Sequence, residues 1–117
     1  MSNLVKNVAT YNTKVLKISG PLGKNFTLKS GENAIQAGQL LSYEATTGKL
    51  VKYEKSNKPA FTIALEGADA TSGDVPVLVA VPGTVFNSVE VKGADIKSDF
   101  NVVKELWGNG IVLEEVK

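Results

Sequence analysis

Three carboxylates lie close together in one short stretch and are the first candidates for chemistry. They are Glu66, Asp69 and Asp74, which share a stretch with Gly67 and Gly73. Three carboxylates could bind calcium, or two of them could act as a general acid and a general base. Their spacing does not fit the D-x-D/N-x-D/N-G calcium loop, and polar residues are expected in any turn between two strands. We therefore interpret the stretch as a solvated turn and predict no metal site.

Residue types on which most enzymes depend are missing from the chain. Its 117 residues include no cysteine and no histidine, and all 13 of its cations are lysines. Disulfides, thiolate catalysis and zinc–thiolate sites are thereby excluded, and the commonest general base is absent. No glycine-rich phosphate-binding motif occurs, and Lys29-Ser30 and Lys97-Ser98 have no recognisable nucleophile context. We predict that the protein is not an enzyme and needs no cofactor.

The composition is that of one ordinary globular domain. Hydrophobic residues make up 43% of the chain, charged residues 21%, and the net charge is +1. Such a weak charge does not attract nucleic acid or an anionic membrane, and arginine, the usual ligand of phosphates and bases, is absent. The first seven residues contain no long apolar run, so we expect neither a signal peptide nor a membrane span. The sequence thus predicts no nucleic-acid partner and no membrane partner.

Strand patterns dominate the middle of the chain. Apolar residues alternate in Ala60–Leu65 and again in Val75–Val81, which is the period of a strand with one buried face. Pro82-Gly83 is a turn signal, and residues 84–91 carry at least one more strand. Further strands are predicted around Phe26 and Leu28, in a hairpin that runs from Leu40 to Tyr53, and at 111–113.

A short helix is predicted between the last two strands. Apolar residues recur there at three- and four-residue steps: Phe100, Val103, Leu106 and Trp107. Asp95 or Ser98 can cap its start, and Gly108 sits where a C-terminal cap belongs. Because Trp107 ends the stripe, we expect it to anchor the core or an interface.

The first 20 residues follow neither the helical nor the strand period throughout. Gly20-Pro21-Leu22-Gly23 separates them from the rest of the chain. One interpretation is the first strand of the domain. The other is an arm that becomes a strand only on the sheet edge of a partner. We divide the chain into an arm, residues 1–20, and a domain, residues 21–117.

Four segments of the chain resemble the head decoration proteins of tailed bacteriophages, the family of the phage lambda decoration protein D. The segments are AGQLL at 37–41 with TGKLV at 47–51, KPAFTIAL at 58–65, DATSGDVP at 69–76 followed by VAVPGTVFN at 79–87, and LWGNGIVL at 106–113. Thr62 stands where the family often has glycine. Each motif alone is weak, but their order and spacing make the match fairly specific.

The resemblance implies a non-enzymatic, mainly β single domain, a bent β-ribbon of the β-clip type with a short C-terminal helix. It implies a homotrimer on the outside of the expanded capsid, at three-fold and quasi-three-fold positions, where it clamps neighbouring major capsid proteins. The protein would then be assembled in the host cytoplasm and reside on the exterior of the virion. The N-terminal segment would contact the capsid through five side chains: Leu4, Val5, Val8, Tyr11 and Val15.

Two other functions compete with capsid decoration. A carbohydrate- or receptor-binding module on a virion surface is one alternative, although aromatic residues make up only 7% of the chain and form no obvious cluster in the sequence. An enzyme on a β-clip scaffold, which in other families hydrolyses nucleotides, is the other. The missing arginines and histidines count against it.

Overall fold

The computed structural model describes residues 16–55 and 58–115. These residues form ten β-strands, a single turn of 3₁₀ helix at Ser88–Glu90 and one α-helix. The predicted fold class, a mainly β single domain of curled strands with a short C-terminal helix, is confirmed.

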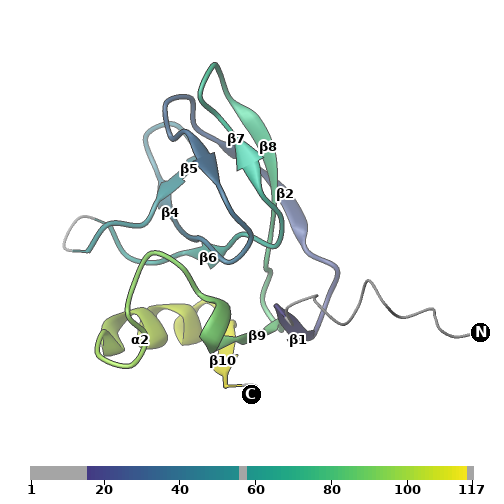
Figure 1. Ribbon diagram of the computed structural model, residues 1–117, viewed down its shortest axis with the longest axis vertical. Helices are drawn as coiled ribbons and strands as arrows, with labels where there is room; N and C mark the ends of the chain where they lie inside the picture. Colours follow the sequence, from purple (N-terminus) through teal and green to yellow (C-terminus); the bar gives the residue numbers. More distant parts are fainter. Residues whose placement is uncertain (1–15, 56–57, 116–117) are drawn as a thin grey trace, which may run out of the picture.

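Five strands form the larger sheet, in the order β6-β4-β5-β2-β8 (Figure 1). Their bounds are Thr62–Ile63 for β6, Leu40–Glu44 for β4, Lys49–Lys52 for β5, Lys24–Leu28 for β2 and Val75–Val79 for β8. The predicted hairpin is β4 and β5, which pair antiparallel through a tight turn. The longest ladder joins β2 to β8 antiparallel, with all five residues of each strand in register.

The larger sheet closes on itself. Ala64, which follows β6, bridges antiparallel to Val79 of β8. The Leu65 amide donates to the Leu78 carbonyl oxygen at 2.8 Å, and the Ala80 amide donates to the Ile63 carbonyl oxygen at 3.0 Å. Strands at the two ends of the sheet are thus joined, so within the described residues each strand of the curled sheet has a neighbour on both sides, although β2 and β5 pair only at Leu28 and Leu50.

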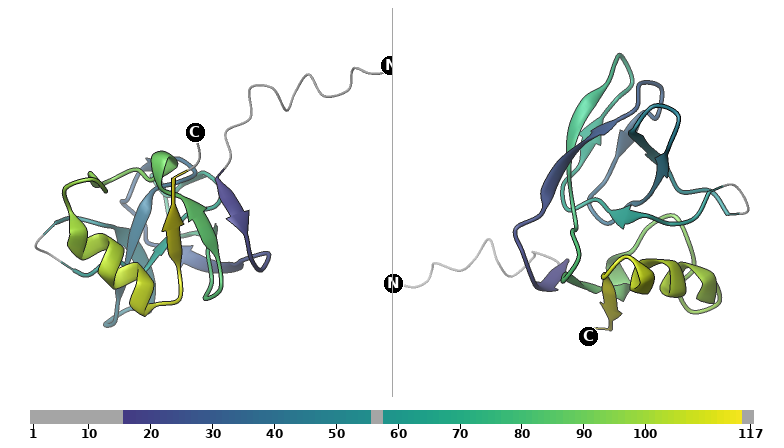
Figure 2. Two further views of the ribbon diagram at one scale, coloured as in Figure 1. Left: turned by 90° about the horizontal axis from the view of Figure 1, so that it is seen from below. Right: turned by 180° about the vertical axis from the view of Figure 1, so that it is seen from behind.

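Two smaller sheets complete the fold. One has the order β1-β9-β10, in which β9 (Val85–Asn87) pairs antiparallel with β1 (Lys17–Ser19) and parallel with β10 (Val112–Glu114). The other pairs β3 (Ala34–Ile35) with β7 (Ala68–Asp69). Figures 1 and 2 show that the three-stranded sheet and helix α2 lie together at one end of the molecule, below the curled sheet.

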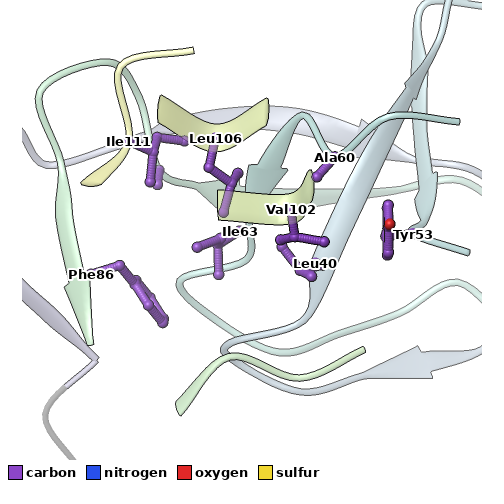
Figure 3. Packing of buried hydrophobic residues seen from close by; sticks show 9 residues of the cluster. Leu40, Tyr53, Ala60, Ile63, Phe86, Val102, Leu106 and Ile111 are labelled. Atoms are coloured by element: carbon purple, nitrogen blue, oxygen red, sulfur yellow. The ribbon is translucent and has the colours of Figure 1, made fainter. Parts of the chain in front are cut away.

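Two clusters of buried apolar residues lie on either side of β4 and β6. Leu40 and Ile63 belong to the cluster under α2, which Figure 3 shows, whereas Leu41 and Ala64 belong to the cluster inside the curled sheet. Adjacent residues of an extended chain point to opposite faces, so β4 contributes to both clusters, and Ile63 of β6 and the following Ala64 lie in different ones. This arrangement attaches α2 firmly to the sheet.

The predicted strand at Ala60–Leu65 is shorter than expected, and its predicted alternation is wrong. Only Thr62 and Ile63 form β6, and both are buried, while Phe61 and Leu65 are only partly buried. The reason is that β6 lies between the two clusters and is covered on both faces. The Thr62 hydroxyl donates to the Ala80 carbonyl oxygen at 2.6 Å, which satisfies a polar group in a buried position.

Helix α2 spans Phe100–Gly108, where a helix was predicted, but the apolar residues of the predicted face do not all lie against the core. Val102 and Leu106 are the fully buried residues, whereas Phe100 is 72% exposed and Trp107 is 67% exposed. Trp107 therefore does not anchor the core. Asp99 occupies the N-cap position, in place of the predicted Asp95 or Ser98.

The part of the N-terminal segment that the structure describes is paired within the domain. Strand β1 pairs with β9, and the Asn87 amide donates to the Leu16 carbonyl oxygen at 2.7 Å. Residues 16–20 thus belong to the domain, and an arm can extend only over residues 1–15. The five predicted arm residues lie outside the described residues: Leu4, Val5, Val8, Tyr11 and Val15.

Candidate functional site

The outer flank of α2 carries a row of apolar side chains, which we call the apolar stripe. It consists of Phe100, Val103 and Trp107, three and four residues apart, which places them on one side of the helix. Val103 is partly buried, and the two aromatic residues are mostly exposed. Large aromatic side chains contribute most to protein interfaces, so two of them exposed on one nine-residue helix indicate a contact surface.

A groove of about 520 Å³, which we call the aromatic groove, lies beside the C-terminal end of the same helix. It is lined by Lys24, Phe26, Phe61, Thr62, Ala80, Val81, Pro82, Gly108, Asn109, Gly110 and Ile111. Phe26 and Phe61 pack edge to face with their ring centroids 5.7 Å apart, and the Lys24 ammonium lies 5.6 Å from the centre of the Phe26 ring. The groove therefore offers aromatic surface with a cation beside it.

Polar contacts from α2 and from Asn109, which caps its C-terminus, hold one wall of the aromatic groove in place. The Asn109 side-chain amide donates to the carbonyl oxygens of Ala60 at 3.3 Å and Phe61 at 3.2 Å. The Glu105 carboxylate accepts a hydrogen bond from the Ala60 amide at 2.8 Å. These bonds fix the backbone that carries the Phe61 ring, so the groove is formed before any partner binds.

The aromatic groove continues into a second hollow of about 390 Å³, with which it shares Phe61 and Asn109. Tyr43 lines this hollow, and its ring centroid lies 5.2 Å from that of Phe61. Phe26, Phe61 and Tyr43 thus form an aromatic row. No such cluster is visible in the sequence, because the three residues come from segments that only the curled sheet brings together.

The three loop carboxylates are not brought together as a site. Asp69 accepts hydrogen bonds from the amide and hydroxyl of Thr71, and the hydroxyl contact does most to hold the pKa of Asp69 below its usual 3.8. Asp74 pairs instead with Lys49 at 2.6 Å. Among the residues that the structure describes, no group of three acidic side chains could hold a metal ion. Two of the three carboxylates therefore serve the local structure.

A polar hollow of about 310 Å³ lies at the start of α2 and was not predicted. Tyr53, Asp99 and Glu105 line it. Burial, the nearby negative charges and the hydrogen bond to Asp99 raise the pKa of the Tyr53 phenol above its usual 10.0. The phenol therefore stays protonated near neutral pH, and it is hydrogen-bonded to the buried side chain of Asp99. This arrangement positions the beginning of the helix.

Comparison with protein-family models gives no match to this chain, and no curated protein is significantly similar to it. Among the described residues, no helix has the length and apolarity that a membrane crossing requires.

Proposed function

We propose that the chain is a capsid decoration protein of a tailed bacteriophage. It binds as a homotrimer to the outer surface of the expanded head, at three-fold positions, and stabilises the head against the pressure of packaged DNA. The main support for the proposal is the order and spacing of four segments, between residues 37 and 113, that resemble phage head decoration proteins. In the fold these segments supply the β4–β5 hairpin, β6, β8, β9, and the end of α2 with β10.

The exposed apolar residues support a function based on protein contacts. Leu22 is 87% exposed and Val89 is 55% exposed, in addition to the two aromatic residues of the apolar stripe. Apolar surface of this kind favours association with other proteins. On a capsid, a trimer makes its contacts with several subunits at once, so weak contacts combine into strong binding. A net charge of +1 suits a protein partner better than nucleic acid.

The N-terminal segment supplies further capsid contacts in this proposal. Leu16 is the first described residue, and it leads into β1 at one edge of the three-stranded sheet. Residues 1–15 precede it, and an extended strand of this length can reach about 50 Å. We propose that this segment adds a strand to an exposed edge of the major capsid protein, where main-chain hydrogen bonds provide affinity.

The test uses empty heads of the phage whose genome encodes this chain. Purified protein is mixed with expanded heads and with unexpanded procapsids, and binding is measured by co-sedimentation and cryo-electron microscopy. We expect density for three copies at each three-fold position of the expanded heads and little on procapsids. Decorated heads should also withstand higher temperature than bare ones. Absence of binding to expanded heads would refute the proposal.

Glycan binding remains the second candidate because the aromatic row of Phe26, Phe61 and Tyr43 lies along open hollows. Aromatic side chains in a concave site can pack against the apolar face of a ligand such as a sugar ring. A glycan array separates the two functions. Specific binding that Phe61→Ala removes, together with no binding to heads, would favour the carbohydrate module.

A further inference from the structure

We infer that the proposed trimer closes head to tail, with the apolar stripe of one copy seated in the aromatic groove of the next. The inference rests on the proposed function for its three-fold ring. It adds the two surfaces that make the contact and the residues at its centre, Phe100 and Trp107 on one side and Phe26 and Phe61 on the other.

The two surfaces lie on opposite flanks of α2. Val102 and Leu106 face the core. Successive residues turn by about 100° around a helix, so Phe100, Val103 and Trp107 lie on one side of this buried pair. Glu105 and Gly108, which line the two hollows, lie on the other side. One flank of the helix projects aromatic side chains, and the other borders a hollow.

This asymmetry determines the type of assembly. A two-fold contact needs one patch that is complementary to itself, whereas a ring joins two different patches, each used once in every copy. A projecting stripe and a hollow groove are different patches. Joining them leaves one stripe and one groove free in an open chain, and a ring of three copies occupies all of them.

The chemistry of the groove suits an indole. The aromatic groove has a volume of about 520 Å³, which lies within the range of sites that bind small organic ligands. Lys24 borders the groove, and tryptophan is the best partner for a cation over an aromatic face. The nitrogen of the Asn109 amide is already bonded to Ala60 and Phe61, so its carbonyl oxygen is the atom suited to accept from an indole N–H.

A second copy fits better than a capsid protein as the occupant of these surfaces. A different partner would have to supply a groove for the stripe and also an apolar insert for the groove. A second copy supplies both with the surfaces already described. Both surfaces are also held rigidly, by the buried Val102 and Leu106 and by the hydrogen bonds of Glu105 and Asn109, so little ordering is needed on association.

The test uses one variant for each surface. The stripe variant combines Phe100→Glu with Trp107→Gln, both at exposed positions. The groove variant is Gly108→Phe. A Cβ atom added at Gly108 would have no atom within 4 Å, and the backbone there does not have a positive φ, so this position accepts a side chain. Because Gly108 lines the groove, we expect the phenyl ring to obstruct it. Gly108→Ala and, at an exposed position outside both surfaces, Lys97→Glu are the controls, and circular dichroism melts verify that every variant folds.

Light scattering on size-exclusion chromatography gives the readout. We expect the wild type and both controls to be trimers and each surface variant to be a monomer. The decisive measurement is an equimolar mixture of the two variants. It should form a heterodimer, because the groove of the stripe variant and the stripe of the groove variant are intact and make one contact.

Other outcomes overturn the inference and leave capsid decoration standing. Surface variants that remain trimeric, or a mixture that remains monomeric, exclude the stripe-in-groove contact. A stripe variant that stays trimeric but no longer binds heads would assign the stripe to the capsid instead. If the free wild type is monomeric, the reconstruction of decorated heads decides, and α2 of one copy must then lie against the aromatic groove of its neighbour.

Discussion

Asp74 joins three parts of the chain that are distant in the sequence. Its carboxylate accepts hydrogen bonds from the Ser30 amide, 44 residues away, at 2.8 Å and from the Lys49 ammonium, 25 residues away, at 2.6 Å. The bond to Lys49, followed by the bond to Ser30, holds the pKa of Asp74 below its usual 3.8. The ionised form thus favours the folded state, and this stabilisation is lost as the pH falls through the folded pKa.

We predict that Asp74→Asn makes thermal stability less sensitive to acid. Between about pH 5 and about pH 2 the melting temperature of the wild type should fall more steeply than that of the variant, because the variant has no carboxylate to protonate at this position. At neutral pH the variant should melt slightly lower, and high salt should narrow that difference by screening Lys49. Equal slopes in acid would show that Asp74 does not contribute to the acid response.

Gly38 is required where two loops meet. Its φ of +97° favours glycine, and a Cβ atom there would overlap the carbonyl oxygen of Glu90. Gly31 has a similar φ of +94° but no atom within 4 Å of the added Cβ. Substitution at Gly31 thus tests the backbone strain alone, whereas substitution at Gly38 tests the strain together with the clash.

We predict that Gly38→Ala costs far more stability than Gly31→Ala. The Gly31 variant should lose about 1 kcal/mol from its left-handed backbone alone. The Gly38 variant should lose at least about 3 kcal/mol, since the Glu90 segment must also move. Urea denaturation of both variants at equal protein concentration provides the comparison. Similar losses of stability in the two variants would mean that the loop around Glu90 shifts at little cost in free energy.

The sequence pattern of helix α2 predicts that a helix forms but not which of its faces is buried. The period predicted a helix and nearly its ends, because only a helix repeats apolar residues at such steps. The sequence contains two overlapping stripes, and Trp107 of the aromatic one was expected to anchor the core or an interface. The smaller pair, Val102 and Leu106, faces the core. A single chain does not reveal which stripe a partner covers, so the exposed stripe could be identified only from the fold.

Short strands were the other elements that could not be predicted. Strand β8 follows its predicted alternation, with Val77 and Val79 buried and Leu78 only partly buried. The β4–β5 hairpin was predicted from its turn, although Leu40, Leu41 and Ser42 of β4 are all buried. Strands β3 and β7 have two residues each, too few to show any period. They exist because the curled sheet brings their backbones together. The aromatic groove was missed for the same reason, since its walls come from distant segments.

We predict that deleting residues 2–14 leaves the domain intact and removes binding to heads. The described contacts begin at Leu16, whose carbonyl oxygen accepts from Asn87, and the deletion retains them. The melting temperature and the oligomeric state should therefore match those of the full chain. Co-sedimentation with expanded heads should be lost, because the predicted arm residues Leu4, Val5, Val8 and Tyr11 are removed.

The control for the deletion extends it through Ser19 and so removes β1. This longer deletion should lower the melting temperature, because β9 then loses its antiparallel partner. If the shorter deletion already unfolds the protein or changes its oligomeric state, residues 2–14 belong to the domain. The arm interpretation would then be abandoned in favour of a first strand.

Closure of the sheet limits where the subunits of a trimer can meet. Judged from the sequence alone, the strands between Phe61 and Val91 carry more apolar surface than a monomer of 117 residues easily covers. The curled sheet and α2 cover most of it within one chain, and Ile63, Val79 and Phe86 are fully buried. Uncovered apolar surface is concentrated instead on α2 and on turns. Subunit contacts are therefore expected at the helix.

The bridge between Ala64 and Val79 has a consequence for how the molecule opens. A sheet with free edges can lose its outermost strand while the rest remains folded, but this sheet has no outermost strand to lose. We predict that the amide hydrogens of Leu65 and Ala80, which bond across the closure, exchange with deuterium only when the whole domain unfolds. Native-state exchange measured by NMR should give both amides the opening free energy of the entire domain. If these two amides exchanged as fast as that of Gly48, in the exposed hairpin turn, the hydrogen bonds of the closure would open locally while the rest of the domain stays folded.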